Sequence, residues 1–79
     1  MVLDYGTMKS YLGQGREIEF CYNNNRYSFS HNSKGWYITE YNNSDYQTFK
    51  TSEELLKRGA IDEKPIAMIW PNVTIEAVF

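Results

Sequence analysis

The chain has 79 residues, a length that allows one domain with a small hydrophobic core. Its hydrophobic content of 42% and charged content of 23% are those of an ordinary globular protein. The net charge of -2 argues against affinity based mainly on phosphate neutralisation, which requires clustered lysine and arginine. A single cysteine, Cys21, excludes an intramolecular disulfide and a metal site with several thiolates.

The N-terminal segment predicts a short helix. Met8, Tyr11 and Leu12 fall roughly on one side of a helix over residues 4–12, and the glycines that follow end it. The same segment lacks the apolar core of a signal peptide, and no stretch approaches the roughly 20 residues of a membrane helix. The sequence therefore predicts a cytoplasmic protein that does not associate with a membrane.

Four segments between residues 16 and 50 alternate apolar and polar side chains, which is the pattern of strands with one buried face. They are residues 16–22, 26–31, 36–41 and 46–50, and segments rich in asparagine and serine separate them. The alternation assigns to one inner layer the side chains of Ile18, Phe20, Tyr22, Tyr27, Phe29, Trp36, Ile38 and Phe49. We therefore predict a four-stranded antiparallel meander.

The turns set the expected pairing of these strands. A turn centred on residues 24–25 pairs Phe20 with Phe29, because a shift of one residue would move the apolar set to the other face. The next loop has four residues and pairs Phe29 with Ile38. The third turn is expected to bring Ile38 opposite Phe49.

A helix is predicted directly after the fourth strand. Thr51, followed three residues later by Glu54, has the capping-box pattern in which each side chain satisfies a free backbone N–H. Lys57 and Arg58 occupy the end where the helix dipole favours cations, and Gly59 ends the helix.

The C-terminal segment predicts one more helix and one more strand. Asp62 is expected to open the helix, with Pro65 tolerated in its first turn, and Pro71 is expected to end it. Residues 73–78 alternate weakly and predict a last strand that could join either edge of the sheet. The expected architecture is an α+β fold, a single domain over residues 1–79, in which helices pack on one face of an antiparallel sheet.

Short segments spread over residues 15–75 form a recognisable combination. They are Gly15-Arg16-Glu17-Ile18-Glu19-Phe20, Gly35-Trp36-Tyr37, Glu54-Leu55-Leu56, Ile61-Asp62 and Ile69-Trp70. Together they resemble a set of small uncharacterised proteins encoded by Gram-positive bacteria and their phages. The resemblance implies a bacterial or phage origin, and it implies no activity because none is assigned to that set.

Residues with catalytic chemistry occur without partners at a recognisable spacing. His31, the single histidine, is expected at the end of the inner face opposite Ile18, with no serine or cysteine arranged around it. Glu17 and Glu19 share a strand face at about 6–7 Å, a spacing that any solvated strand also shows. The sequence therefore predicts no catalytic residue, no metal site and no cofactor.

The outer face of the predicted sheet carries the pattern that most favours a function. The candidate binding residues are Arg26, Tyr37, Tyr41, Tyr46 and Lys50. The expected registers place Arg26 and Tyr46 on either side of Tyr41, and Lys50 opposite Tyr37. Tyrosine and arginine dominate binding hot spots, although cross-strand tyrosine pairs also stabilise a sheet without any partner. We predict a non-enzymatic module that binds a protein partner through this face.

Two other interactions stay open. Single-stranded nucleic acid could stack on the sheet tyrosines, but the net charge and the acidic strip of Glu17 and Glu19 disfavour it. If residues 73–79 form an edge strand, its unpaired backbone groups could template self-association. An enzyme would need a deep pocket, which a chain of this length rarely provides.

Overall fold

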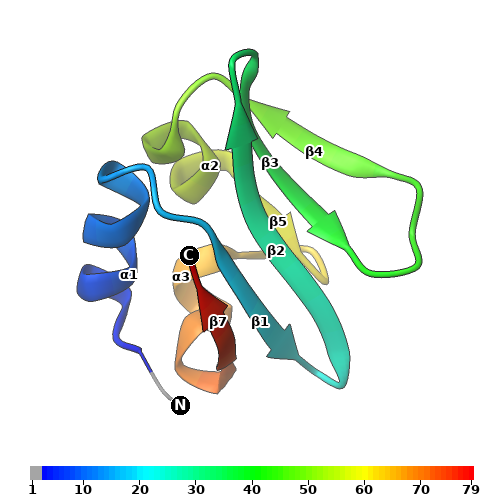
Figure 1. Ribbon diagram of the computed structural model, residues 1–79. Helices are drawn as coiled ribbons and strands as arrows, with labels where there is room; N and C mark the ends of the chain where they lie inside the picture. The colour runs from blue at the N-terminus through cyan, green and yellow to red at the C-terminus, as the bar shows by residue number, and fades with distance from the viewer. Residues whose placement is uncertain (1–2) are drawn as a thin grey trace.

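The computed structural model describes residues 3–79, which form a five-stranded antiparallel sheet and three α-helices (Figure 1). The strands of this sheet are β1 (Ile18–Tyr22), β2 (Asn25–Asn32), β3 (Gly35–Glu40), β4 (Tyr46–Phe49) and β7 (Thr74–Val78). The helices are α1 (Tyr5–Gly13), α2 (Ser52–Arg58) and α3 (Ile66–Ile69), the last followed by a 3₁₀ turn, η1 (Trp70–Asn72). A separate small hairpin pairs β5 (Ala60–Ile61) with β6 (Lys64–Pro65).

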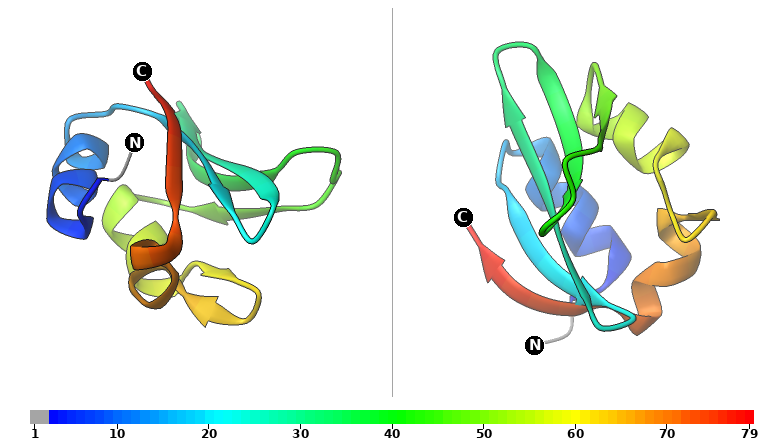
Figure 2. Two further views of the ribbon diagram at one scale, coloured as in Figure 1. Left: turned by 90° about the horizontal axis from the view of Figure 1, so that it is seen from below. Right: turned by 90° about the vertical axis from the view of Figure 1, so that its right-hand side faces the viewer.

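The sheet is the predicted meander with one strand added. Its strand order is β4-β3-β2-β1-β7, so the C-terminal strand joins the edge next to β1. All three helices lie on one side of the sheet, and on the other side the described residues place none (Figure 2). The α+β class and the single helical layer are therefore confirmed, and the position of the last strand, which the sequence left open, is fixed.

Aromatic side chains form the centre of the core between the sheet and the helices. The predicted inner residues Ile18, Phe20, Tyr27, Phe29, Trp36 and Ile38 are buried, and Tyr22 and Phe49 are partly buried. The Phe20 ring contacts the rings of Phe29 and Trp70, with centroid distances of 4.8 and 5.4 Å. Rings packed at such distances and angles contribute both buried area and favourable edge contacts.

The first hairpin is tighter than the expected one. Asn23 and Asn24 have φ values of 55° and 67°, as in the two-residue type I′ turn whose twist matches that of paired strands. Phe20 consequently pairs with Tyr27 and not with Phe29. Because the pairing shifts by two residues, each side chain keeps its predicted face, and the prediction was wrong only in register.

The second hairpin has the expected register, whereas the third is also shifted by two residues. Ile38 pairs with Gln47, and Phe49 pairs with Trp36. Gln47 has the same strand parity as Phe49 and points toward the helical side, where its amide accepts from Ala60 N–H at 3.1 Å and donates to Ala60 O at 2.6 Å. These two bonds explain why a polar side chain is stable in an otherwise apolar layer.

Both longer helices begin at capped residues. Asp4 accepts a hydrogen bond from the backbone N–H of Thr7 at 2.8 Å, so α1 starts one residue later than expected. Bonds from the Thr7 backbone and then its side chain lower the pKa of Asp4. Thr51 accepts from Glu54 N–H at 3.1 Å and caps α2 as predicted, but the Glu54 carboxylate, the other half of the expected capping box, accepts from Arg58 at 3.5 Å instead.

The segment after α2 differs from the prediction. Asp62 does not open a helix, because Asp62 and Glu63 have φ values of 54° and 62° and form the turn of the β5–β6 hairpin. The helix begins only after Pro65, which lacks the N–H that a helix interior needs. Pro71 lies within the 3₁₀ turn η1 and does not end the helix that precedes it.

Candidate functional site

Tyrosine side chains stand on the side of the sheet that carries no helix. Tyr41 and Tyr46 are 66% and 60% exposed, whereas Tyr37 is half-buried. Tyr37 packs its ring edge-on against Tyr46 at a centroid distance of 5.7 Å. Tyr46 and Tyr37 are diagonal neighbours on β4 and β3. The register partner of Tyr46 is Thr39 and not the expected Tyr41. Two neighbouring strands therefore hold a pair of contacting rings, of which Tyr46 is the more exposed.

Arg26 connects the tyrosines to the opposite edge of the sheet. Its Nε donates to the Glu76 carboxylate of β7 at 2.7 Å, and this carboxylate raises the pKa of the guanidinium. Its Cζ lies 5.7 Å from the centroid of the Tyr41 ring, within the range of a cation–π contact. The backbone places the two residues side by side, because Tyr41 N–H donates to Arg26 O at 2.8 Å. Arg26, Tyr37, Tyr41 and Tyr46 are named the tyrosine face below.

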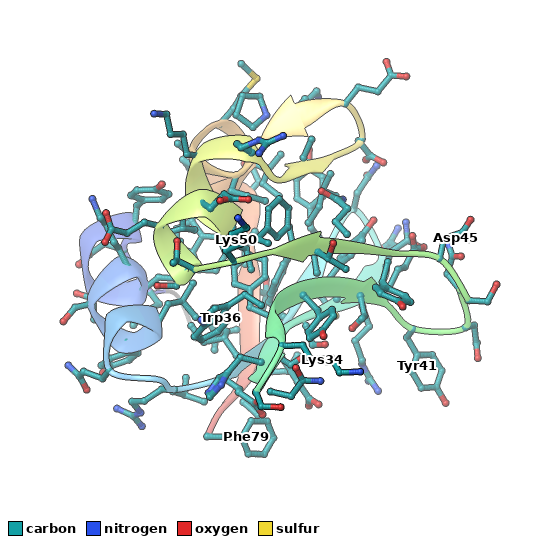
Figure 3. The ribbon with its side chains drawn as sticks, turned by 90° about the horizontal axis from the view of Figure 1, so that it is seen from above. Lys34, Trp36, Tyr41, Asp45, Lys50 and Phe79 are labelled. Atoms are coloured by element: carbon teal, nitrogen blue, oxygen red, sulfur yellow. The ribbon has the colours of Figure 1, made fainter. Side chains whose placement is uncertain are left out.

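Lys50 does not lie opposite Tyr37, as the sequence had suggested. Thr48 occupies that position, and β4 ends at Phe49. Lys50 follows the strand and is exposed where the chain enters α2, at the end of β4 remote from Asp45 (Figure 3). The two-residue shift of the third hairpin is the physical reason, because it moves every β4 residue two positions along β3.

The middle of the helix-free side is shallow. Ser28 and Thr39 face each other across β2 and β3, with their hydroxyl oxygens 2.6 Å apart. Together with Glu19, Arg26 and Tyr41 they line a depression of about 110 Å³. The short hydroxyl side chains lie beside the longer side chains of Arg26 and Tyr41. This side of the sheet is therefore uneven, and a flat partner surface would not fit it closely.

His31, the candidate catalytic histidine, makes contacts that hold two strands together. The His31 ring packs on Trp36 at 4.5 Å, and its Nε2 lies 2.8 Å from Gly15 O. The Glu17 carboxylate accepts from the His31 backbone N–H at 3.1 Å. Ile18, the expected partner of His31, pairs elsewhere because the first hairpin is tighter. These contacts fasten the start of β1 to the end of β2.

A second hollow, which the sequence did not predict, lies between the tip of the β3–β4 hairpin and the β5–β6 hairpin. Its volume is about 240 Å³. Its polar lining residues are Tyr27, Glu40, Asn43, Asp45, Tyr46, Gln47 and Asp62. We call it the hairpin hollow. One signal was present in the sequence, because Glu40 has the same strand parity as Ile38 and so points to the inner face.

Neither metal ligands nor a membrane span can be assigned within residues 3–79. Those residues contain no group of three histidine, cysteine, aspartate or glutamate side chains that could hold a metal ion. None of the helices that the structure describes is long and apolar enough to cross a membrane. Comparison with protein-family models, with curated proteins and with solved structures finds no match for this chain.

Proposed function

We propose that this protein is a small non-enzymatic binding module that contacts a protein partner through its tyrosine face. The observation that supports this proposal is the exposure of Tyr41 and Tyr46 beside Arg26, on a sheet whose other aromatic side chains are buried or partly buried. Exposed aromatic and arginine side chains supply most of the energy in protein interfaces. We also propose that the protein acts in the cytoplasm, in keeping with the sequence-based prediction.

The composition of the face indicates the chemistry of the partner. Arg26 is already paired with Glu76, and Glu19 lies on the same side of the sheet. A surface with apolar groups at its centre and donors or basic groups at its rim would match the rings and the remaining carboxylates. An acidic partner would meet like charge at this rim.

Affinity capture with matched variants tests the proposal. The double substitution Tyr41→Ser/Tyr46→Ser removes the two most exposed rings of the face. Met68→Ser is the control, because Met68 is 61% exposed on α3, on the helical side of the sheet. A partner that the wild type and Met68→Ser retain, and that the double variant loses, would support the tyrosine face. Equal retention by all three proteins would refute it.

Single-stranded nucleic acid is the alternative ligand for the exposed rings of the tyrosine face. Titration with short single-stranded oligonucleotides at low salt distinguishes it, since phosphate binding weakens steeply as salt rises. Salt-sensitive binding that is lost in Tyr41→Ser/Tyr46→Ser would replace the protein partner with single-stranded nucleic acid. If the oligonucleotides cause no change in these titrations, a protein remains the expected ligand of the tyrosine face.

Self-association through β7 remains a separate proposal about partners. β7 pairs with β1 on one side only, and Phe79 at its end is 64% exposed. The pairing register shifts between Glu19 and Phe20, an irregularity of the kind that protects sheet edges from further pairing. Sedimentation measurements over a range of concentrations would show a mass above the 9.3 kDa of one chain if the edge self-associates.

A further inference from the structure

We propose that the free edge of β4 pairs with β4 of a second copy of this chain, so that two sheets join into one through antiparallel strands. β4 is the edge strand opposite β7, and the described residues place no strand beyond it (Figure 1). This edge is distinct from the β7 edge. The inference goes beyond the proposed function, because it needs no partner of the tyrosine face.

The backbone of β4 directs hydrogen-bonding groups away from the sheet. The Phe49 carbonyl oxygen lies against Gly35 at the start of β3, so Phe49 directs its N–H and C=O toward that strand. Successive residues of a strand direct these groups to opposite sides, and Tyr46 and Thr48 therefore direct theirs outward. No hydrogen bond from elsewhere in residues 3–79 reaches the outward groups of these two residues. A row of such groups is a template for another strand.

The two edges of the sheet differ in the features that block pairing. β4, with the residues Tyr46–Phe49, contains no proline and no charged side chain, and its register with β3 is regular. β7 carries Glu76 within the strand, and its register with β1 shifts at that residue. Charged side chains and bulges are common means by which proteins prevent edge pairing. The length of β4, four residues, limits the affinity of a pair but does not block a second strand.

The charges at the two ends of β4 favour a second copy as the partner. Asp45 precedes the strand and Lys50 follows it, and the two exposed side chains lie at opposite ends of β4 (Figure 3). The ion pairs of the described residues involve neither of them. Antiparallel pairing of two β4 strands brings Asp45 of each copy close to Lys50 of the other, whereas parallel pairing would bring like charges together. The edge is therefore complementary to itself in charge.

The outward backbone groups restrict how the two strands can meet. Antiparallel strands exchange hydrogen bonds where outward-facing residues lie opposite each other, so Thr48 is suited to pair with Thr48 of the second copy. This register places Tyr46 opposite Lys50 of the second copy, on the helix-free side of both sheets. Tyr46 is 60% exposed, and its ring offers a face for the ammonium group. The two tyrosine faces then lie on the same side of one continuous sheet.

Sedimentation equilibrium of matched lysine variants, each checked for folding by circular dichroism, tests the inference. We expect the wild type to form a reversible dimer, with about twice the mass of 9.3 kDa, at concentrations up to about 1 mM. Thr48→Lys places like charges at the centre of the pair and should raise the dimer Kd about tenfold or more. Thr74→Lys, at an exposed position of β7, is the control and should dimerise as the wild type does. A monomeric wild type at about 1 mM, or a loss in Thr74→Lys as large as in Thr48→Lys, would overturn the proposal.

Charge reversal at the ends of β4 tests the antiparallel arrangement. Asp45→Lys and Lys50→Asp each bring like charges together at both ends of the pair, so each variant alone should dimerise about two- to thirtyfold more weakly. An equimolar mixture of the two variants restores opposite charges and should form a heterodimer with an affinity near that of the wild type. Lys34→Asp, in the turn between β2 and β3, changes the net charge as Lys50→Asp does and should leave the dimer unchanged. A mixture that dimerises no better than the separate variants would refute the pairing, whereas the tyrosine face is tested independently by affinity capture.

Discussion

The two faces of the sheet use the same kind of side chain in opposite ways. On the helical side Phe20 and Phe29 are fully buried and contact Trp70. On the other side Tyr41 and Tyr46 are more than half exposed, with their hydroxyl groups in reach of solvent. Burial of aromatic rings on the helical side stabilises the fold, whereas the exposed rings add little to stability and remain available for contacts. We therefore expect substitutions on the helical side to change stability, and substitutions on the tyrosine face to change binding.

The largest effect is expected from the centre of the helical side. Phe20→Ala removes a ring with no exposed surface and leaves a cavity against Tyr27, Phe29 and Trp70. The free energy of unfolding should fall by about 3–5 kcal/mol, which urea denaturation measures. If Phe20→Ala lowers the free energy of unfolding by no more than Tyr41→Ala does, the two faces do not differ in their contribution to stability.

A glycine at the start of β3 should give the next largest effect. At Gly35 an added Cβ would overlap the carbonyl of Phe49 in β4, and the φ of 142° is unfavourable for other residues. We expect Gly35→Ala to lower the free energy of unfolding by about 1–3 kcal/mol. Gly13→Ala is the control, since its Cβ would meet no atom within 4 Å, and this variant should be at least as stable as the wild type.

Loss of the Gln47 amide from the inner layer should lower the free energy of unfolding slightly less than Gly35→Ala does. Gln47→Ala removes both hydrogen bonds to Ala60 and leaves the Ala60 N–H and C=O without partners. The cost should be about 1–3 kcal/mol, toward the lower end because the site is only partly buried. Hydrogen exchange of the β5–β6 amides should accelerate in the same variant. Unchanged exchange would show that these bonds do not hold the hairpin to the sheet.

The buried phenol should make stability depend on alkaline pH. The pKa of Tyr27 is raised above its ordinary value near 10, mainly by burial, so the folded state holds this proton more tightly than the unfolded state. Its contribution is present below about pH 10 and is lost as the pH rises through the folded pKa. Tyr27→Phe should flatten this loss in denaturation experiments. A variant with the same alkaline slope as the wild type would contradict the assignment.

The smallest effect on stability is expected on the tyrosine face. Tyr41→Ser should change the free energy of unfolding by less than about 0.5 kcal/mol, because the side chain is largely in water. Tyr46→Ser should cost slightly more, since it also removes the contact with Tyr37. A loss of several kcal/mol in either variant would show that these rings serve the fold.

Sequence reasoning found the faces of the strands, but it found the register of only one of the three hairpins, the one between β2 and β3. Parity alone assigns Phe20, Phe29 and Ile38 to one side, and this assignment survives any shift by an even number of residues. Residues 23–25 are three successive asparagines, and each can occupy a turn, so the pattern could not choose between the two hairpins. The same ambiguity in the third hairpin misplaced Lys50.

The hairpin hollow was beyond sequence reasoning for a different reason. One of its walls depends on Asp62 and Glu63, two consecutive residues other than glycine with positive φ, which is an uncommon conformation. An aspartate before an apolar pattern favours a helix start, so the β5–β6 hairpin was not expected. Without that hairpin, Glu40 and Asp45 have no opposite wall.

Oxidative footprinting with hydroxyl radicals, followed by mass spectrometry, tests the separation of the faces most directly. We expect Tyr41 and Tyr46 to be modified at nearly the rate of the urea-unfolded chain. Trp36 and Trp70, which are 9% and 2% exposed, should be strongly protected. Modification of Trp36 and Trp70 at the rate of Tyr41, or protection of Tyr41 in the isolated chain, would contradict it.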